Sequence, residues 1–231
     1  MKVHCLFEQS GTFKNEFKKL GYEAFDYDIL NDFGQTDFKV DLFDEIRKAY
    51  QEEESIFDNF KNDDLILAFF PCTRFETQVT LLFRGEANQQ KKWTDIQKLE
   101  YDMKLHDELH ELYELLCMMS VVVIRKGLKM IIENPCTPPH YLTTYWCMKP
   151  SLIDKNRRDD GDYYKKPTQY WFINCKVQQN LVFEPIEVVK QKTIKNSKHD
   201  GRDRKVVRSL IHPQYARRFI KQYILEEKQN D

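Results

Sequence analysis

Apolar and polar positions alternate along this chain in short runs and in helical repeats that follow one another from the N-terminus. Short apolar runs at residues 3–7 and 65–70 have the length and composition of strands, and residues 23–29 are expected to form a second strand that ends in acids. Residues 12–20 and 43–50 instead repeat their apolar positions every three or four residues, as one face of a helix does. Strands that alternate with helices predict an α/β fold, with a mostly parallel sheet and helices on both of its faces.

The second half of the chain extends this pattern. Residues 93–129 are predicted to form one long helix or two joined helices, with an apolar stripe that includes Leu105, Leu109 and Leu112. Two strands follow, and they are expected at residues 130–132 and in the aromatic-rich run at 169–174.

The end of the chain differs in charge. The segment from 190 to 221 is strongly basic, begins as a polar loop and becomes helical from about Pro213. It is either a solvated loop and surface helix or a patch that contacts phosphate groups. We therefore predict a domain at residues 1–185, followed by a basic loop and C-terminal helical extension at 186–231 that packs back on it.

Composition adds the class of protein. The 231 residues are enough for one sizeable core, and the charged side chains nearly cancel to a net charge of −1. Six cysteines without paired spacing favour free thiols in a reducing compartment. No apolar run approaches the roughly 20 residues of a membrane helix, and no signal peptide is evident. We expect a cytoplasmic protein that does not associate with membranes.

The first strand runs into a small-residue turn, "LFEQSGTF", and then into a helix. Backbone N–H groups at the start of such a helix can hold a nucleotide or the amino-acid end of a cofactor. Asp28, near the end of the next strand, lies where ribose hydroxyls would bind, and Asp41 could line an adenine pocket. Because the turn has one glycine where a dinucleotide site has three, a purely structural turn is the alternative.

Two reactive side chains end core strands. Cys72 follows one strand in "LAFFPCTRF", and Glu133 ends another in "IIENP". In a parallel sheet both would reach the edge where ligands bind. Cys72 is either a structural thiol or a nucleophile whose pKa a nearby positive charge lowers. A carboxylate such as Glu133 is costly at that point unless it is paired or used.

Taken in order, five segments resemble the motifs of cytosine-C5 DNA methyltransferases, most closely the short phage- and bacteria-type members. They are "LFEQSGTF", "FDYDI", "FFPCTRFE", "IIENP" and "KKPTQYWF". The segment "RSLIHPQYARRFI" is similar to a degenerate form of the family's final motif, which packs back beside the first. The resemblance implies a Rossmann-like methyltransferase sheet with S-adenosylmethionine at its carboxyl edge.

The resemblance also implies a cofactor site at the ends of the first strands. Asp28 would bind the ribose hydroxyls and Asp41 would approach the adenine amine. The remaining cofactor-binding residues lie in the first turn and in the Pro-Cys motif: Phe7, Gln9, Ser10, Gly11 and Pro71.

The implied reaction gives each catalytic residue a role. Attack of the Cys72 thiolate on carbon 6 of cytosine turns the ring into an enamine, whose carbon 5 then accepts the methyl group. Glu133 would act as the general acid at ring N3. Lys166, or Lys165 beside it, stands where the family places an arginine near the target base. The implied partner is DNA, contacted through the basic tail, and the base must leave the duplex stack.

Departures from the family pattern leave other functions open. Gln9 replaces a usual glycine, Phe70 replaces a second proline, and "ENP" and a lysine pair replace the commoner Glu-Asn-Val and arginines. Only about 35 residues separate "KKPTQYWF" from the final helix, where sequence-reading members carry a long recognition domain. The chain is thus predicted to methylate DNA with little sequence selectivity. The alternatives are a catalytically silent module that binds nucleic acid or a partner protein, and methylation of a free pyrimidine.

A metal site is not predicted. His106 and His110 have the spacing of metal ligands on one helix, but no third ligand is evident and the cysteines form no CxxC pair.

Overall fold

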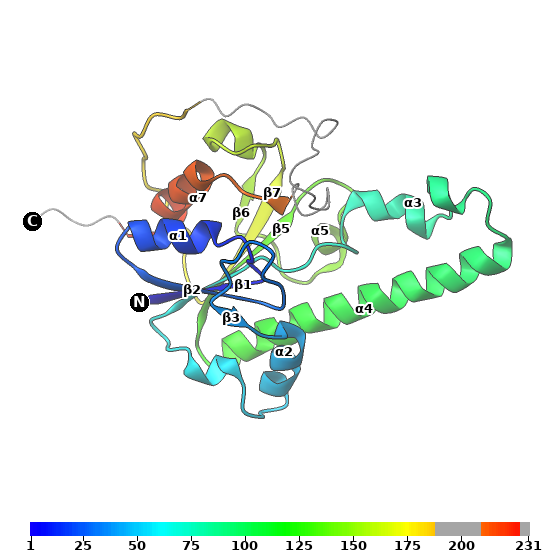
Figure 1. The fold of residues 1–231 in the computed structure, drawn as a ribbon, viewed down its shortest axis with the longest axis horizontal. Helices are drawn as coiled ribbons and strands as arrows, with labels where there is room; N and C mark the ends of the chain where they lie inside the picture. The colour runs from blue at the N-terminus through cyan, green and yellow to red at the C-terminus, as the bar shows by residue number, and fades with distance from the viewer. Residues whose placement is uncertain (188–208, 227–231) are drawn as a thin grey trace, which may run out of the picture.

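The computed structural model describes residues 1–187 and 209–226 and has an α/β fold (Figure 1). Its centre is a seven-stranded sheet in the order β3-β2-β1-β4-β5-β7-β6. Strands β1 to β5 are parallel, and β7 lies antiparallel between β5 and β6. The predicted mostly parallel sheet is therefore confirmed. The strands are β1 (Lys2–Leu6), β2 (Glu23–Asp28), β3 (Phe38–Lys39), β4 (Leu65–Ala68), β5 (Lys129–Pro135), β6 (Leu152–Asp154) and β7 (Thr168–Ile173).

Helices cover both faces of the sheet, as the apolar runs predict. In β4, Leu65 and Leu67 face one hydrophobic cluster, whereas Ile66 and Ala68 face another. A strand that is buried on both faces reads as a continuous apolar run, because successive side chains point to opposite sides. One face is covered by α1 (Thr12–Lys19) and α7 (Pro213–Phe219), and the other by α2 (Leu42–Tyr50) and α4 (Asp95–Arg125) (Figure 1).

The segment predicted at 93–129 is one continuous helix, α4. A capping box fixes its start, since Thr94 Oγ1 accepts a hydrogen bond from Gln97 N at 3.3 Å and Gln97 Oε1 accepts one from Thr94 N at 3.0 Å. At 1.5 Å per residue α4 is about 46 Å long, more than twice the length of a typical strand. Its first half therefore extends beyond the sheet as an arm with α3 (Thr80–Phe83) (Figure 1).

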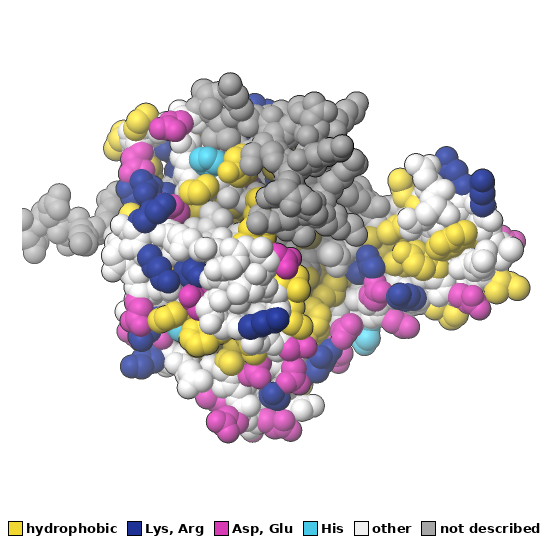
Figure 2. Space-filling model, viewed as in Figure 1, with side chains coloured by type: hydrophobic (Ala, Val, Ile, Leu, Met, Phe, Trp, Pro, Cys, Tyr) yellow, Lys and Arg dark blue, Asp and Glu magenta, His cyan; other side chains and the backbone are white. Residues whose placement is uncertain are grey.

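The arm carries hydrophobic side chains on its surface (Figure 2). Ile96, Leu99 and Met103 share one side of α4 and are each more than 60% exposed. The second half of the helix, by contrast, places Leu112 and Leu116 in the core cluster that covers β4 and β5. One helix thus supplies both core packing and an exposed apolar stripe.

The C-terminal helix α7 returns to the first helix. Its Phe219 ring contacts the Phe13 ring of α1, with centroids 6.1 Å apart, and Arg217 Nε donates to Glu16 Oε2 at 3.0 Å. Arg218 pairs with Asp160 at 2.8 Å. Arg217 and Arg218 of α7 are therefore both engaged in ion pairs. The predicted basic loop lies mostly outside the described residues, and the predicted division at residue 185 stays a prediction.

Two strands escaped the sequence analysis, and one strand end was placed wrongly. Both residues of β3 are exposed, and β6 is only partly buried, so neither forms an apolar run. Glu133 does not end its strand, because β5 continues to Pro135 through pairing with β7. Within the described ranges no helix has the length and apolar character needed to cross a membrane.

Candidate active site

The strand register brings the predicted site residues of four strands to one edge of the sheet. Leu6 of β1 is level with Tyr27 of β2 and with Ala68 of β4, and Ala68 is level with Ile132 of β5. The next residues along these strands share a level that we call the carboxyl edge: Phe7, Asp28, Phe69 and Glu133. The strand order reverses between β1 and β4 at this edge, which is where open α/β sheets bind ligands.

The first turn leaves β1 through two left-handed residues. Phe7 has a φ of +61° and Gly11 a φ of +65°, a region that glycine enters freely and other residues rarely. A side chain at Gly11 would also be tight, because its Cβ would lie 3.1 Å from the Cβ of Gln35. Gln9 Oε1 accepts a hydrogen bond from Asp32 N at 3.3 Å, and the Ser10 and Thr12 hydroxyls lie 3.1 Å apart. The turn is therefore held against the loop that follows β2.

Glu8 completes this turn, and the sequence analysis missed it. Its Oε1 accepts from Phe13 N at 2.8 Å and its Oε2 from Lys14 N at 3.3 Å, which satisfies two free N–H groups at the start of α1. Burial raises the pKa of the Glu8 carboxyl to about 7, against the lowering effect of those two hydrogen bonds. An acid four residues before the start of a predicted helix is the signal that could have found it.

The two predicted aspartates have local roles as well. Asp28 Oδ1 accepts from Leu30 N at 2.8 Å, and burial raises the pKa of the Asp28 carboxyl. Asp41 is the N-cap of α2, and its Oδ1 accepts from Phe43 N at 3.0 Å and from Asp44 N at 3.3 Å. Asp28 thus lies at the carboxyl edge, whereas one oxygen of Asp41 already caps a helix. Their cofactor contacts stay predictions.

Cys72 lies just beyond the end of β4, after Pro71. Its Sγ donates a hydrogen bond to Glu76 Oε1 at 3.0 Å. Arg74, the nearest cation in the sequence, turns away and donates from Nε to Glu108 Oε2 at 2.5 Å. Burial raises the pKa of the Cys72 thiol well above its usual range, Lys166 opposes this, and the charge of Glu76 adds to it. Cys72 is therefore a protonated thiol at neutral pH.

Glu133 occupies the neighbouring strand and is paired with a buried arginine. It lies opposite Tyr170 of β7, and its Oε1 is 3.6 Å from Arg157 Nη1. Arg157 also forms an ion pair with Asp162, and the side chains of both residues are only 1% exposed. A carboxylate at this position was expected to be paired or used, and the structure provides the pair.

Arg157 and Asp162 are the further residues that sequence reasoning missed here. Arg157 stands in "NRRDD", where two arginines and two aspartates read as a solvated turn. Its guanidinium also lies 4.8 Å from the ring centroid of Tyr215 in α7, an arrangement that gives a cation–π contact. Only the tertiary fold distinguishes Arg157 from the arginine that follows it.

Asn134 and Lys166 also lie near Cys72. Asn134 Nδ2 donates to the carbonyl oxygen of Phe70 at 2.8 Å, which ties β5 to the segment that carries Cys72. Lys166 precedes β7, and its positive charge lowers the pKa of the Cys72 thiol. Cys72, Glu133 and Lys166 thus come from three segments to one region; their catalytic roles stay predictions.

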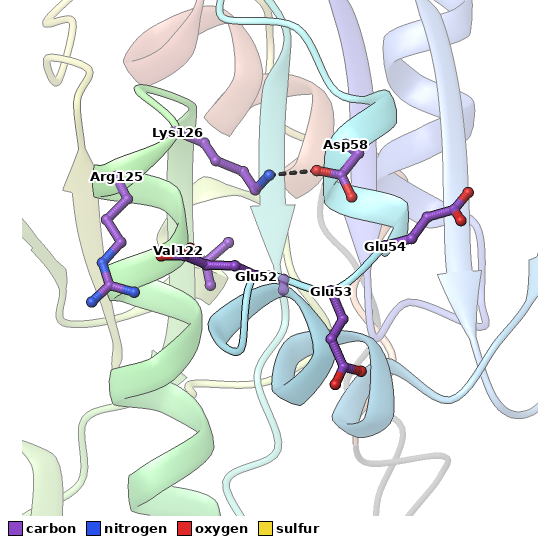
Figure 3. A pocket seen from close by; sticks show the side chains of 8 residues that line it. Glu52, Glu53, Glu54, Asp58, Val122, Arg125 and Lys126 are labelled. Atoms are coloured by element: carbon purple, nitrogen blue, oxygen red, sulfur yellow. Dashed lines mark hydrogen bonds and ion pairs between the residues drawn. The ribbon is translucent and has the colours of Figure 1, made fainter.

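One surface hollow, of about 430 Å³, lies away from this edge, near the amino ends of β4 and β5 (Figure 3). Its lining is of mixed charge, with Glu52, Glu53 and Glu54 near Arg125, while Lys126 pairs with Asp58 at 2.5 Å. A wide, charged hollow of this kind lacks the apolar walls of most ligand sites. Among residues 1–187 and 209–226, no group of three His, Cys, Asp or Glu side chains could hold a metal ion.

The comparisons with known proteins add no assignment. No protein-family model matches the chain, and no curated protein is significantly similar to it. The functional interpretation is therefore carried by the residues of the carboxyl edge.

Proposed function

We propose that this protein is an S-adenosylmethionine-dependent methyltransferase that transfers a methyl group to carbon 5 of cytosine in DNA. The observation that carries the proposal is that Cys72, just beyond β4, and Glu133, in the neighbouring parallel strand β5, lie close enough for the charge of Glu133 to act on the thiol, as the charge of Lys166 does. A thiol, a carboxyl group and a cation are the groups that addition to carbon 6 of a pyrimidine requires.

The first turn fits a cofactor that has a positive charge and no phosphate. In nucleotide sites, the free N–H groups of a helix N-terminus bind phosphate. Here the Glu8 carboxyl group already accepts the N–H groups of Phe13 and Lys14, so a phosphate would compete with an acid. S-adenosylmethionine has no phosphate and has a cationic sulfonium group. The acidic lining by Glu8 and Asp28 therefore supports this cofactor over a dinucleotide.

In the proposed reaction, Phe7 to Gly11 and Asp28 would hold the cofactor, which supplies an electrophilic methyl group. Cys72 Sγ would bond to carbon 6 of the cytosine. Glu133, after taking up a proton from solvent, would donate it to ring N3 and so neutralise the charge that develops there. Lys166 would stabilise negative charge near the base. Arg157, through its contact with Glu133, would keep that carboxyl group at the carboxyl edge.

A catalytically silent methyltransferase-like module is the second candidate. Two observations favour it: burial keeps the Cys72 thiol protonated, and Gln35 closely approaches the space above Gly11. Such a module would bind DNA or a partner protein without any dependence on the cofactor. Its DNA affinity would fall steeply as salt rises, since phosphate contacts release counterions.

Cofactor binding is the first test, because it needs no knowledge of the acceptor. S-adenosylmethionine is titrated calorimetrically into the wild type, into Asp28→Ala, and into Glu53→Ala, a control at the opposite edge. We expect micromolar binding that is lost in Asp28→Ala and kept in Glu53→Ala. The absence of binding at millimolar cofactor would reject the enzyme and favour the silent module.

Methyl transfer is the second test. Tritiated S-adenosylmethionine and duplex DNA are incubated with the wild type, with Cys72→Ser and with Cys136→Ser, a matched thiol control near the end of β5. Incorporation of label into 5-methylcytosine is expected in the wild type and in Cys136→Ser only. Full transfer by Cys72→Ser would contradict the proposed nucleophile.

A further inference from the structure

Glu76 lies four residues after Cys72, and the fold holds its side chain against the thiol. Phe75 N donates to the carbonyl oxygen of Cys72 at 2.9 Å, which closes a tight turn between the two residues. The Phe75 ring is 1% exposed and lies in the core beside Phe70. This turn directs Glu76 back toward Cys72, so that Sγ and Oε1 are 3.0 Å apart.

Contacts on both sides of Glu76 fix this geometry. The carbonyl oxygen of Phe75 accepts a hydrogen bond from Tyr141 N at 3.0 Å. Thr77 Oγ1 donates to the carbonyl oxygen of Pro139 at 2.8 Å. The residues before and after Glu76 are thus both tied to the segment that follows β5. The contact between Cys72 and Glu76 is therefore a constrained feature of the edge, and not a chance approach of two flexible side chains.

A base is needed at this position. Burial and the neighbouring carboxylates keep the thiol protonated, whereas only a thiolate, or a thiol that loses its proton during attack, is a good nucleophile. A catalytic base must lie within hydrogen-bond reach of the proton that it removes. Glu76 Oε1 meets that requirement.

His140 is close enough for its pKa to respond to the charge of Glu76, but its geometry excludes it as the base. Burial lowers the pKa of His140 to about 4, so the ring is neutral. Its Nδ1 is 3.2 Å from Nε2 of Gln169, an amide nitrogen that also donates to the carbonyl oxygen of Pro135 at 2.8 Å. Nδ1 therefore accepts a hydrogen bond, and the proton of the neutral ring lies on Nε2. No basic lone pair of His140 is left for the thiol.

We propose that Glu76 is the proton acceptor of Cys72, an inference that rests on the proposed function. As the bond between Sγ and carbon 6 of cytosine forms, the S–H bond breaks and its proton passes to the Glu76 carboxylate. The electron pair of the 5,6 double bond moves into the ring as N3 takes a proton from Glu133. Once the methyl group is on carbon 5, N3 returns its proton to Glu133 and carbon 5 loses its own proton to a water molecule. The electron pair of that C–H bond re-forms the 5,6 double bond as the bond between carbon 6 and sulfur breaks, and sulfur recovers its proton from Glu76.

The first experiment measures the thiol without cofactor or acceptor. The rate of alkylation of Cys72 by iodoacetamide is followed against pH by mass spectrometry, in the wild type, in Glu76→Gln and in Glu86→Gln, an exposed acid further along the same segment. Removing an adjacent negative charge favours the thiolate. We expect the alkylation midpoint of Glu76→Gln to fall by about one pH unit, which makes it about tenfold faster at neutral pH. An unchanged midpoint would overturn the inference.

The second experiment measures the covalent step. Duplex DNA with 5-fluorocytosine in place of cytosine is incubated with S-adenosylmethionine, and the protein–DNA adduct is quantified. Fluorine cannot leave carbon 5 as a cation, so the Cys72 adduct persists. We expect Glu76→Gln to form it about a hundredfold more slowly at neutral pH than the wild type, although its thiol is the more reactive toward iodoacetamide. Glu76→Asp, which keeps a carboxylate, should recover part of the rate.

The outcomes separate this inference from the proposed function. Adduct formation in Glu76→Gln that is as fast as in the wild type would overturn the role of Glu76 and leave the methyltransferase proposal intact. No adduct with the wild type, beside a shifted alkylation midpoint, would overturn the cytosine chemistry and the catalytic role of Glu76 together.

Discussion

Two buried cations, Lys14 and Arg157, lie on opposite sides of the carboxyl edge. They differ in how far water can reach the carboxylates that pair with them. Lys14 of α1 binds Asp26 of β2 at 3.0 Å and Asp37 at 3.1 Å. Asp37 is 31% exposed, so one side of this cluster meets water. Burial opposes the charge of Lys14, but hydrogen bonds and charges from both aspartates outweigh burial and raise the pKa of Lys14.

Arg157 has no such access to water. Its partners Asp162 and Glu133 have side chains that are 1% and 9% exposed, and the Tyr215 ring lies over the guanidinium. If its partner is lost, a charge next to solvent can be hydrated again, whereas a charge that is fully enclosed by protein cannot. The side of the edge near Lys14 can therefore adjust to a lost charge, while the side that carries Glu133 is fixed by charges that must all be present.

Removing Arg157, the cation that water cannot reach, should have the largest effect on stability. Arg157→Met leaves two buried carboxylates without a counter-charge, and we expect the free energy of unfolding to fall by about 3–5 kcal/mol. Urea unfolding followed by circular dichroism measures it. Arg84→Met, at an exposed arginine of the arm, should change stability by less than about 0.5 kcal/mol. A loss below about 1 kcal/mol in Arg157→Met would show that water reaches the cluster.

The pH dependence of stability tests the side of the edge near Lys14, where Glu8 is buried. The pKa of Glu8 is raised from 4.5 to about 7 in the folded protein, so the folded state holds this proton more tightly than the unfolded state does. Its stabilising effect is complete below pH 4.5 and is lost as pH rises through 7. Wild-type stability should fall by roughly 2–3 kcal/mol between pH 5 and pH 8 through this group. The wild type and Glu8→Gln are unfolded in urea at each pH. The free energy of unfolding of Glu8→Gln should not show the part of the fall that is due to Glu8.

Lys14 provides the matched counterpart of Arg157. Lys14→Met should lower the free energy of unfolding by about 2 kcal/mol, less than Arg157→Met, because water can reach Asp37. Lys18→Met, at an exposed position of the same helix, is the control and should be nearly neutral. Equal losses in Lys14→Met and Arg157→Met, measured in the same urea series, would remove the distinction between the two clusters.

The sequence predicts the strands that position this site better than it predicts which charged residues are buried there. The strand β4, which leads to Cys72, and the strand β5, which carries Glu133, are buried on both faces, and the parallel arrangement brings them beside β1 and beside β2, which ends at Asp28. Periodicity cannot give the order of strands, nor show that β7 runs antiparallel beside β5 and extends it past Glu133. Those features depend on pairing between distant segments.

The buried charges were missed for a related reason. Arg157 and Arg158 are adjacent and chemically identical in the sequence, yet Arg157 is 1% exposed because Glu133, Asp162 and Tyr215 reach it from different elements. Glu76 likewise reads as one more surface acid until the turn at Phe75 returns it to Cys72. Local patterns reveal which residues are apolar, but a partner across the fold decides which charges are buried.

The smallest expected effect on stability concerns the Tyr215 hydroxyl, which links α7 to the strands β6 and β7. The Tyr215 hydroxyl lies 2.8 Å from the Tyr170 hydroxyl and donates to Asp154 Oδ2 at 2.8 Å. Tyr215→Phe keeps the ring over Arg157 and removes both contacts, so we expect a loss of about 1–2 kcal/mol. Tyr145→Phe, at a residue that is 67% exposed, is the control.

Hydrogen exchange can show where that loss acts. If the hydroxyl ties α7 to the sheet, the amides of α7 should exchange faster in Tyr215→Phe, while those of β5 keep their protection. If amide exchange became equally faster throughout the sheet, the hydroxyl would instead stabilise the whole cluster of Arg157, Glu133 and Asp162. In that case α7 belongs to the same cooperative unit as Arg157, and the C-terminal helix is part of what fixes Glu133 in place.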